Sequence, residues 1–153
     1  MKTNPRNRAR QRLEERLSAL KPEDRFMPPP KGWVRAIRNA IGMSGVQLAS
    51  RLEVRPQTVD AIEKSEANGS IQLKTLRRAA EAMDCTLVYA LVPNTSLGDS
   101  VAQRARKIAM RDLQRVAHTM KLEAQGTGEA DMDARIEAYI RDVIKDRDLW
   151  NEL

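Results

Sequence analysis

Residues 45–65 read GVQLASRLEVRPQTVDAIEKS, and their pattern fits two short helices joined by a tight turn. The apolar positions recur at helical spacing on both sides of the turn, at Leu48, Ala49, Leu52, Val54, Val59 and Ile62. Pro56 suits the first turn of the second helix, because its missing N–H would have no partner within the helix. The small Ala49 marks the expected point of closest approach, and Val59 can fill the space opposite.

Flanking residues predict a helix on each side of this pair. Trp33, Val34, Ile37 and Ile41 mark a helix before it, and Leu73, Leu76, Ala80 and Met83 mark one after it. Ser44 is a good N-cap, with Gln47 placed for a capping box. Two short helices that cross steeply form the helix-turn-helix pattern, which holds the first turn of its second helix out toward the major groove of DNA.

Residues 33–92 resemble the Xre/Cro family of phage-repressor-like helix-turn-helix domains, which typically have five helices. The resemblance implies a structural ion pair between Arg38 and Glu63. Glu53 departs from the family, which usually has glycine in the turn, and a positive φ there would cost on the order of 1 kcal/mol. Gly45 stands where phage repressors often have glutamine, although backbone N–H groups at that helix end can still bind phosphate.

The same resemblance implies which side chains face DNA. The expected base-reading residues are Arg55, Gln57, Thr58 and Ala61. Gln57 can pair bidentately with adenine, and Ala61 can contact a thymine methyl group. The expected phosphate contacts are Ser44, Arg51, Lys64 and Lys74, with Arg55 as a further candidate. The alternative for Gln57 and Thr58 is an ordinary solvated helix start, and surface lysines and arginines are common in any case.

The composition narrows the function classes. Of 153 residues, 41% are apolar and only 3% aromatic, which predicts an aliphatic core and gives little for base stacking on RNA. No apolar run approaches the roughly 20 residues that span a bilayer, and the basic start does not resemble a signal peptide, so we expect a cytoplasmic protein with no membrane contact. With one cysteine (Cys85) and one histidine (His118), we expect no enzyme activity, no catalytic residues, no metal and no cofactor.

The charge is uneven along the chain. Residues 1–31 carry nine Lys/Arg and four Asp/Glu, whereas residues 125–153 carry four and eight. A basic front predicts a polyanion partner, and Arg6, Arg8, Arg10 and Arg12 could follow phosphates or enter a minor groove. The alternatives are a disordered arm and a well-solvated protein with uneven charge.

Three regions are expected. Residues 1–31 form a basic arm, with a helix over 8–20 and an extended Pro28–Pro30 linker. Residues 32–93 form the helix-turn-helix domain plus a strand, and residues 94–153 a helical pair for dimer or partner contacts. That pair comprises a long helix over 97–122 and a last helix capped by Asp131 or Asp133. The fold class is mainly all-α: a phage-repressor-like domain with one short β-strand and a C-terminal helical extension.

The strand is expected at residues 86–92, which read TLVYALV. A lone strand leaves its backbone groups unpaired, and no second strand is predicted nearby. Pairing with the same segment of another copy across a two-fold axis is one expectation. A short extended run packed against helices is the alternative.

Most of the chain also resembles mobile mystery protein A. The resemblance lies in the basic arm, the Gly32–Arg35 entry, the Leu48–Leu52 helix and the Cys85–Pro93 segment. It implies a small Xre-type regulator encoded beside a Fic/Doc-domain protein. Thr119–Glu123 matches five positions of the inhibitory Ser/Thr-x-x-x-Glu-Gly/Asn helix of Fic antitoxins, with Ala124 in place of Gly or Asn. Such a loose match is also typical of an ordinary helix end.

Two functions from different classes follow. The first is a sequence-specific DNA-binding transcriptional regulator, a homodimer that represses its own toxin–antitoxin-like operon from a palindromic operator in double-stranded DNA. The alternative is an antitoxin whose C-terminal helices bind and inhibit a Fic/Doc adenylyltransferase.

Overall fold

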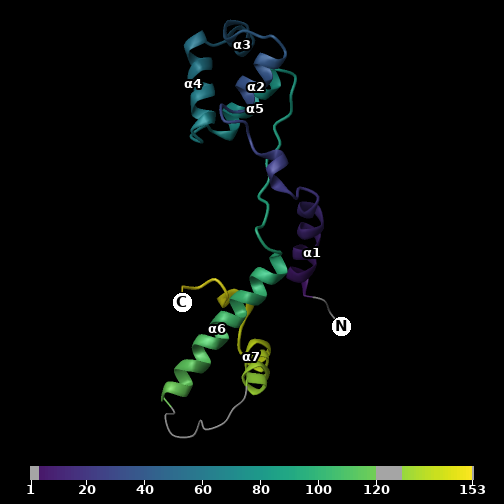
Figure 1. Ribbon diagram of the computed structural model, residues 1–153, viewed down its shortest axis with the longest axis vertical. Coiled ribbons are helices and arrows are strands. Elements are labelled where there is room, and N and C mark those ends of the chain that lie inside the picture. Colours follow the sequence, from purple (N-terminus) through teal and green to yellow (C-terminus); the bar gives the residue numbers. More distant parts are fainter. Residues whose placement is uncertain (1–3, 120–128, 153) are drawn as a thin grey trace. The chain divides into compact units, whose positions relative to one another are not determined.

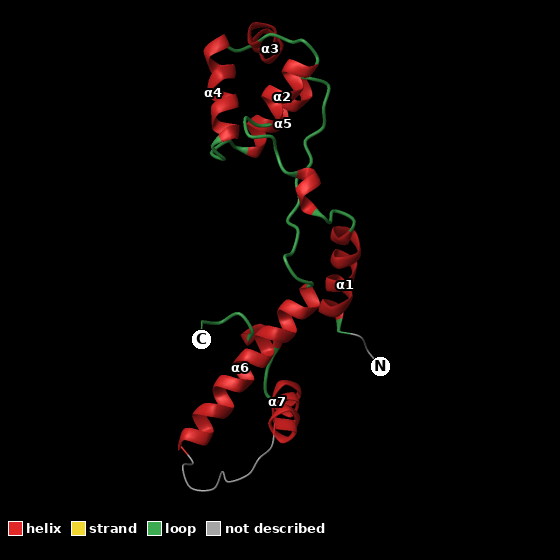
Figure 2. Ribbon diagram, viewed as in Figure 1, coloured by secondary structure: helices red, strands yellow, loops and turns green. Residues whose placement is uncertain are grey.

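The structure is a computed structural model, and it describes residues 4–119 and 129–152. The chain divides into two compact units, one formed by residues 20–92 and the other by the residues on either side of that segment (Figure 1). Within the described ranges the regular structure is helical and no strand is formed (Figure 2). The all-α prediction is therefore confirmed.

The 20–92 unit holds four α-helices after a short 3₁₀ helix. In chain order these are η1 (Glu23–Phe26), α2 (Trp33–Ala40), α3 (Gly45–Leu52), α4 (Pro56–Ala67) and α5 (Leu73–Ala82). The resemblance implied a fifth helix, which this fully described segment lacks. Its core is aliphatic, as the composition predicts, and consists of Val34, Leu48, Ala49, Leu52, Val59, Ala79 and Met83.

Local sequence sets where α3 and α4 begin. Ser44 Oγ accepts a hydrogen bond from Gln47 N at 3.1 Å, and Gln47 Oε1 accepts one from Ser44 N at 2.7 Å, so the expected capping box is present. Pro56 is the first residue of α4, where it removes no intrahelical hydrogen bond.

The four helices end in the same way. Each is followed by a residue with positive φ, namely Gly42, Glu53, Gly69 and Asp84. The next N–H then donates to a carbonyl five residues earlier, as Val54 N does to Ala49 O at 2.9 Å and Cys85 N to Ala80 O at 2.9 Å. This pattern satisfies carbonyls that the helix end leaves without partners. Val54 and Cys85 also pack against the core, so the chain turns inward after α3 and after α5.

The sequence predicted a strand at residues 86–92, and this prediction is wrong because the segment is a loop. A ladder needs a second extended segment to exchange backbone hydrogen bonds, and the described part of this chain supplies none beside it. The segment leaves the core at Cys85 and exposes Val88, Tyr89 and Leu91. Pairing with another copy stays a prediction.

The second unit contains α1 (Pro5–Ser18), α6 (Leu97–Thr119), α7 (Glu129–Asp142) and the 3₁₀ helix η2 (Asp146–Asp148). Ala105, Ile108 and Leu149 form a buried cluster. Arg104 of α6 donates to Leu149 O at 2.7 Å and to Asn151 O at 2.6 Å, so it fixes the segment that follows η2.

The residues of α1 pack in this unit, which differs from the separate arm over 1–31 that the sequence suggested. Glu14 Oε1 accepts a hydrogen bond from Gly98 N at 3.4 Å, at the start of α6. Asn4 donates to Asp146 at 3.0 Å, and Arg6 lies 3.4 Å from the same carboxylate. These polar contacts connect α1 to the rest of the unit, whereas Leu13 of its leucine stripe stays 50% exposed.

A polar cluster joins α6 and α7. Tyr139 donates its hydroxyl hydrogen to Asp112 Oδ2 at 3.0 Å, and Arg111 Nε donates to Asp112 Oδ1 at 2.9 Å. Burial alone would raise the pKa of Asp112, but these two hydrogen bonds, together with the positive charges of Arg111 and Arg115, lower it below its usual value. The carboxylate therefore stays charged and links the two helices.

Glu53 offers a test of the turn geometry. Its φ is 57° and its ψ 42°, a left-handed conformation that favours glycine. Glu53→Gly should therefore raise the free energy of unfolding of the full chain, by up to about 1 kcal/mol, in denaturant titrations. Ser50→Gly, in the middle of α3, is the matched control and should lower it by a similar amount. A loss of stability in Glu53→Gly would contradict the strained turn.

Candidate nucleic-acid interface

The candidate interface begins with the packing of α3 against α4. Ala49 and Val59 are each only 1% exposed and lie in one buried cluster with Leu48 and Leu52. A small residue on one helix lets the other approach closely, and the β-branched valine has few rotamers and so fixes the spacing. The half-buried Val54 completes the contact from the turn. The start of α4 is held in place by this apolar contact.

The helix α4 has two faces. Val59 and Glu63 are buried on the face toward the core, with Ile62 partly buried beside them. The expected base-reading residues all lie exposed, at Arg55, Gln57, Thr58 and Ala61. Arg55 is the N-cap in an extended conformation, and no side chain caps the first turn of α4. The first turn therefore presents polar side chains to solvent, as recognition helices do.

The expected phosphate contacts are also exposed. Arg51, Lys64 and Lys74 lie on α3, α4 and the start of α5, and none forms an ion pair with another residue that the structure describes. The hydroxyl oxygen of Ser44 accepts the Gln47 N–H, so its own hydrogen remains available as a donor. The exposed Asp60 sits among these residues and opposes phosphate, unless it accepts a hydrogen bond from cytosine.

The structure brings Arg38 and Glu63 together. Arg38 Nε donates to Glu63 Oε1 at 2.7 Å and its Nη2 to Oε2 at 3.2 Å, a bidentate pair. The third donor, Nη1, reaches Met43 O at 3.0 Å. The hydrogen bond to Glu63 raises the pKa of Arg38 above its usual value, although burial opposes this. Glu63 is the buried charged residue of the core at 5% exposure, and this pairing compensates its burial.

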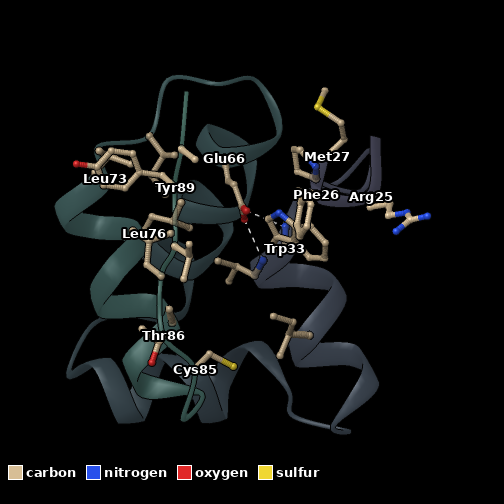
Figure 3. Close-up of a pocket in the computed structure, with 18 of the residues that line it drawn as sticks. Arg25, Phe26, Met27, Trp33, Glu66, Leu73, Leu76, Cys85, Thr86 and Tyr89 are labelled. Atoms are coloured by element: carbon tan, nitrogen blue, oxygen red, sulfur yellow. Dashed lines mark hydrogen bonds between the residues drawn. The ribbon is translucent and has the colours of Figure 1, made fainter. Parts of the chain in front are cut away.

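Sequence reasoning missed a second carboxylate of α4. Glu66 accepts hydrogen bonds from Trp33 N at 2.7 Å and Val34 N at 3.0 Å, and so caps the first turn of α2 (Figure 3). Gly32, the N-cap residue, has no side chain for this role. Its φ is 84°, and a Cβ atom there would lie 2.6 Å from Glu66 Oε2. The signal in the sequence was a glycine at an N-cap, which leaves helix N–H groups in need of an acceptor from elsewhere.

Comparison with known families fits this geometry. Residues 34–89 match the family model described as "Helix-turn-helix", a segment that spans α2 to α5 and most of the extended run after them. This part of the chain is similar to helix-turn-helix domains. It covers somewhat more than a third of the 153 residues, and it supports a DNA-binding transcriptional regulator of the Xre type. No curated protein and no solved structure gave a match.

Two other features are missing from the residues that the structure describes, a metal-binding cluster and a membrane-spanning helix. No group of three or more His, Cys, Asp and Glu side chains there is placed to hold a metal ion. None of the described helices has the length and apolar character needed to cross a membrane. The Fic-type pattern falls at the end of α6: Thr119 is its last residue, and Met120 to Ala124 lie outside the described residues.

The ion pair between Arg38 and Glu63 predicts strong coupling. Arg38→Met and Glu63→Leu should each lower the free energy of unfolding by about 3–5 kcal/mol, because each leaves a buried charge without its partner. The double variant should lose much less free energy of unfolding than the two single variants lose together, as measured by denaturant titration of the full chain. Arg141→Met, which breaks an exposed pair with Asp142, is the control and should have little effect. Additive losses in the double variant would show that the two side chains act independently.

Proposed function

We propose that this protein is a sequence-specific DNA-binding transcriptional regulator that places the start of α4 in the major groove. The observation that carries the proposal is the exposure of Gln57 and Thr58 on the first turn of α4, a helix that packs on α3 through a buried cluster that includes Ala49 and Val59. In this arrangement Gln57 reads adenine, while Thr58 and Ala61 contact thymine methyl groups. Arg55 reaches either a base or a phosphate.

The surrounding charges support a duplex rather than another partner. Arg51, Lys64 and Lys74 are exposed on three successive helices, and Ser44 lies at the start of α3. Contacts of this kind fix the position of a domain on the phosphate backbone. The protein has few aromatic side chains for stacking, which argues against single-stranded RNA. Such a regulator acts in the cytoplasm, where its operator lies.

The finer part of the proposal concerns the operator. A single domain of this size reads one half-site, so we propose a homodimer on a palindrome with half-sites about one helical turn apart. The resemblance to mobile mystery protein A points to autorepression of a toxin–antitoxin-like operon. A footprint of the purified protein on the DNA upstream of its own gene tests this. A protected palindrome supports the proposal, and uniform weak protection contradicts it.

A second candidate is a protein-neutralising antitoxin. The unit that contains α6 and α7 carries exposed apolar side chains on helices outside the 20–92 unit, including Met110 of α6 and Met132 of α7. The partner suggested by the resemblance is a Fic/Doc-domain protein encoded beside this one. Co-purification of the two products, and inhibition of adenylylation by the full chain, would support this role. Separate elution of the two proteins would count against it.

The base-reading assignment predicts a loss of sequence preference. Gln57→Ala with Thr58→Ala should weaken binding to the operator by about 2–4 kcal/mol, since a bidentate base contact is worth about 1–3 kcal/mol, and leave binding to random DNA nearly unchanged. Fluorescence anisotropy with both duplexes measures the difference. The control is Gln103→Ala with Gln114→Ala, two exposed glutamines of α6. Unchanged operator affinity in the first variant would refute the assignment.

The proposed phosphate contacts predict a loss of affinity that does not depend on the DNA sequence. Arg51→Gln, Lys64→Gln and Lys74→Gln should weaken binding to all duplexes alike, and each should reduce the slope of log K against log salt by about 0.9. The triple variant is compared with Lys107→Gln, Arg135→Gln and Lys145→Gln, which remove the same net charge from exposed positions of the other unit. An equal slope in both triple variants would mean that net charge alone is responsible.

A further inference from the structure

An apolar groove of about 620 Å³ lies in the 20–92 unit, beside the extended residues 85–92 (Figure 3). Its lining comes from the segment around η1, from α2 and α5, and from that extended run. The lining residues include large apolar side chains that the single chain leaves exposed: Phe26, Met27, Trp33, Leu73, Val88 and Tyr89. A contiguous exposed apolar surface of this kind marks an interaction site rather than ordinary protein surface.

The charges around the groove limit what can occupy it. Its charged lining residues are Glu23, Arg25 and Glu66, and Glu66 is already engaged at the start of α2. The two others have opposite sign and lie two residues apart. A nucleic acid or a strongly charged peptide would therefore find no complementary field here. A second copy of the chain offers complementary charges, because a two-fold axis can set Glu23 of one copy near Arg25 of the other.

The backbone beside the groove gives an independent reason to expect a second copy of the chain there. Residues 86–92 make no backbone hydrogen bond with any residue that the structure describes. Val88 is 81% exposed and Leu91 86% exposed, although β-branched and aliphatic side chains of this kind favour a paired strand. A second copy brings the same row of donors and acceptors and the same apolar side chains. An extended segment of this type pairs readily with another.

We propose that two copies of this protein associate through residues 86–92, paired antiparallel across a two-fold axis, so that each copy covers the apolar groove of the other. The exposed Val88, Tyr89 and Leu91 of each copy then become buried at the interface. This inference deepens the proposed function, which requires two reading helices, and it identifies where the dimer forms.

Cross-linking tests the register directly. In an antiparallel pair the residue on the two-fold axis faces its own copy, with Cβ atoms about 4.5–5.5 Å apart, within reach of a disulfide. Cys85→Ala removes the natural thiol, and Val88→Cys, Tyr89→Cys, Ala90→Cys and Leu91→Cys are then made one at a time in the full chain. Under mild oxidation we expect one or two of these positions to form covalent dimers much faster than Ala40→Cys, an exposed position of α2 outside the groove. Rates no faster than that control at all four positions would overturn the proposal.

Sedimentation velocity without DNA measures the dimer dissociation constant and gives a second, independent test. Val88→Lys and Leu91→Lys change side chains that the single chain exposes, so the thermal unfolding of the monomer, measured at a concentration too low for dimers, should stay the same. Dimer dissociation constants should rise roughly tenfold or more in each variant, because an apolar side chain is no longer buried at the interface. Ile41→Lys adds the same charge at an exposed apolar position outside the groove and should leave the dissociation constant unchanged.

The two proposals fail separately. A wild-type chain that stays monomeric at high concentration, or variants that associate like the wild type, would overturn the association through residues 86–92 and leave DNA binding untouched. A dimer that shows no preference for its operator would instead contradict the proposed function and leave the association intact.

Discussion

The packing of α3 on α4, around a buried cluster that includes Ala49 and Val59, determines where the candidate base-reading side chains can point. The candidate base-reading residues lie on α4 or at its N-cap, so any change in this packing would rotate or lift them together. Side chains on one rigid helix keep their relative positions, but their distance from a groove depends on how that helix is held. An alanine at the contact leaves the least tolerance, because a larger residue there would have to displace a fully buried neighbour.

Two carboxylates on the core-facing side of α4 reinforce this packing. Glu63 and Glu66 are three residues apart, and they hold opposite ends of α2: Glu63 binds Arg38 and Glu66 caps the first turn. Arg38 also reaches Met43 O, so the same pair fixes the loop that leads into α3. The face of α4 that carries Glu63 and Glu66 is thus connected to α2 and to the loop that leads into α3. Polar pairs of this kind define a geometry that apolar contacts alone leave less specific.

The parts of this fold that could be predicted from the sequence are local. The capping box at Ser44, the proline at the start of α4 and the unusual Glu53 turn each depend on residues within one or two helical turns. The cap that Glu66 provides could not be predicted in this way, because it joins residues more than thirty positions apart. The loop at residues 86–92 was misjudged for a related reason. Its composition favours a strand, but a strand exists only where another segment pairs with it.

The same distinction explains why the candidate site is less determined than the fold. Exposure of Gln57 and Thr58 follows from the helical period once Val59 and Ile62 face the core, so that pattern was predictable. Whether these side chains read bases depends on DNA atoms outside the protein, which no internal contact constrains. Because the exposed face of α4 takes no part in core packing, its residues can change with little cost in stability, whereas Val59 and Glu63 cannot. A domain built this way can acquire a new operator by exchanging a few exposed residues while α3, α4 and their buried contacts stay as they are.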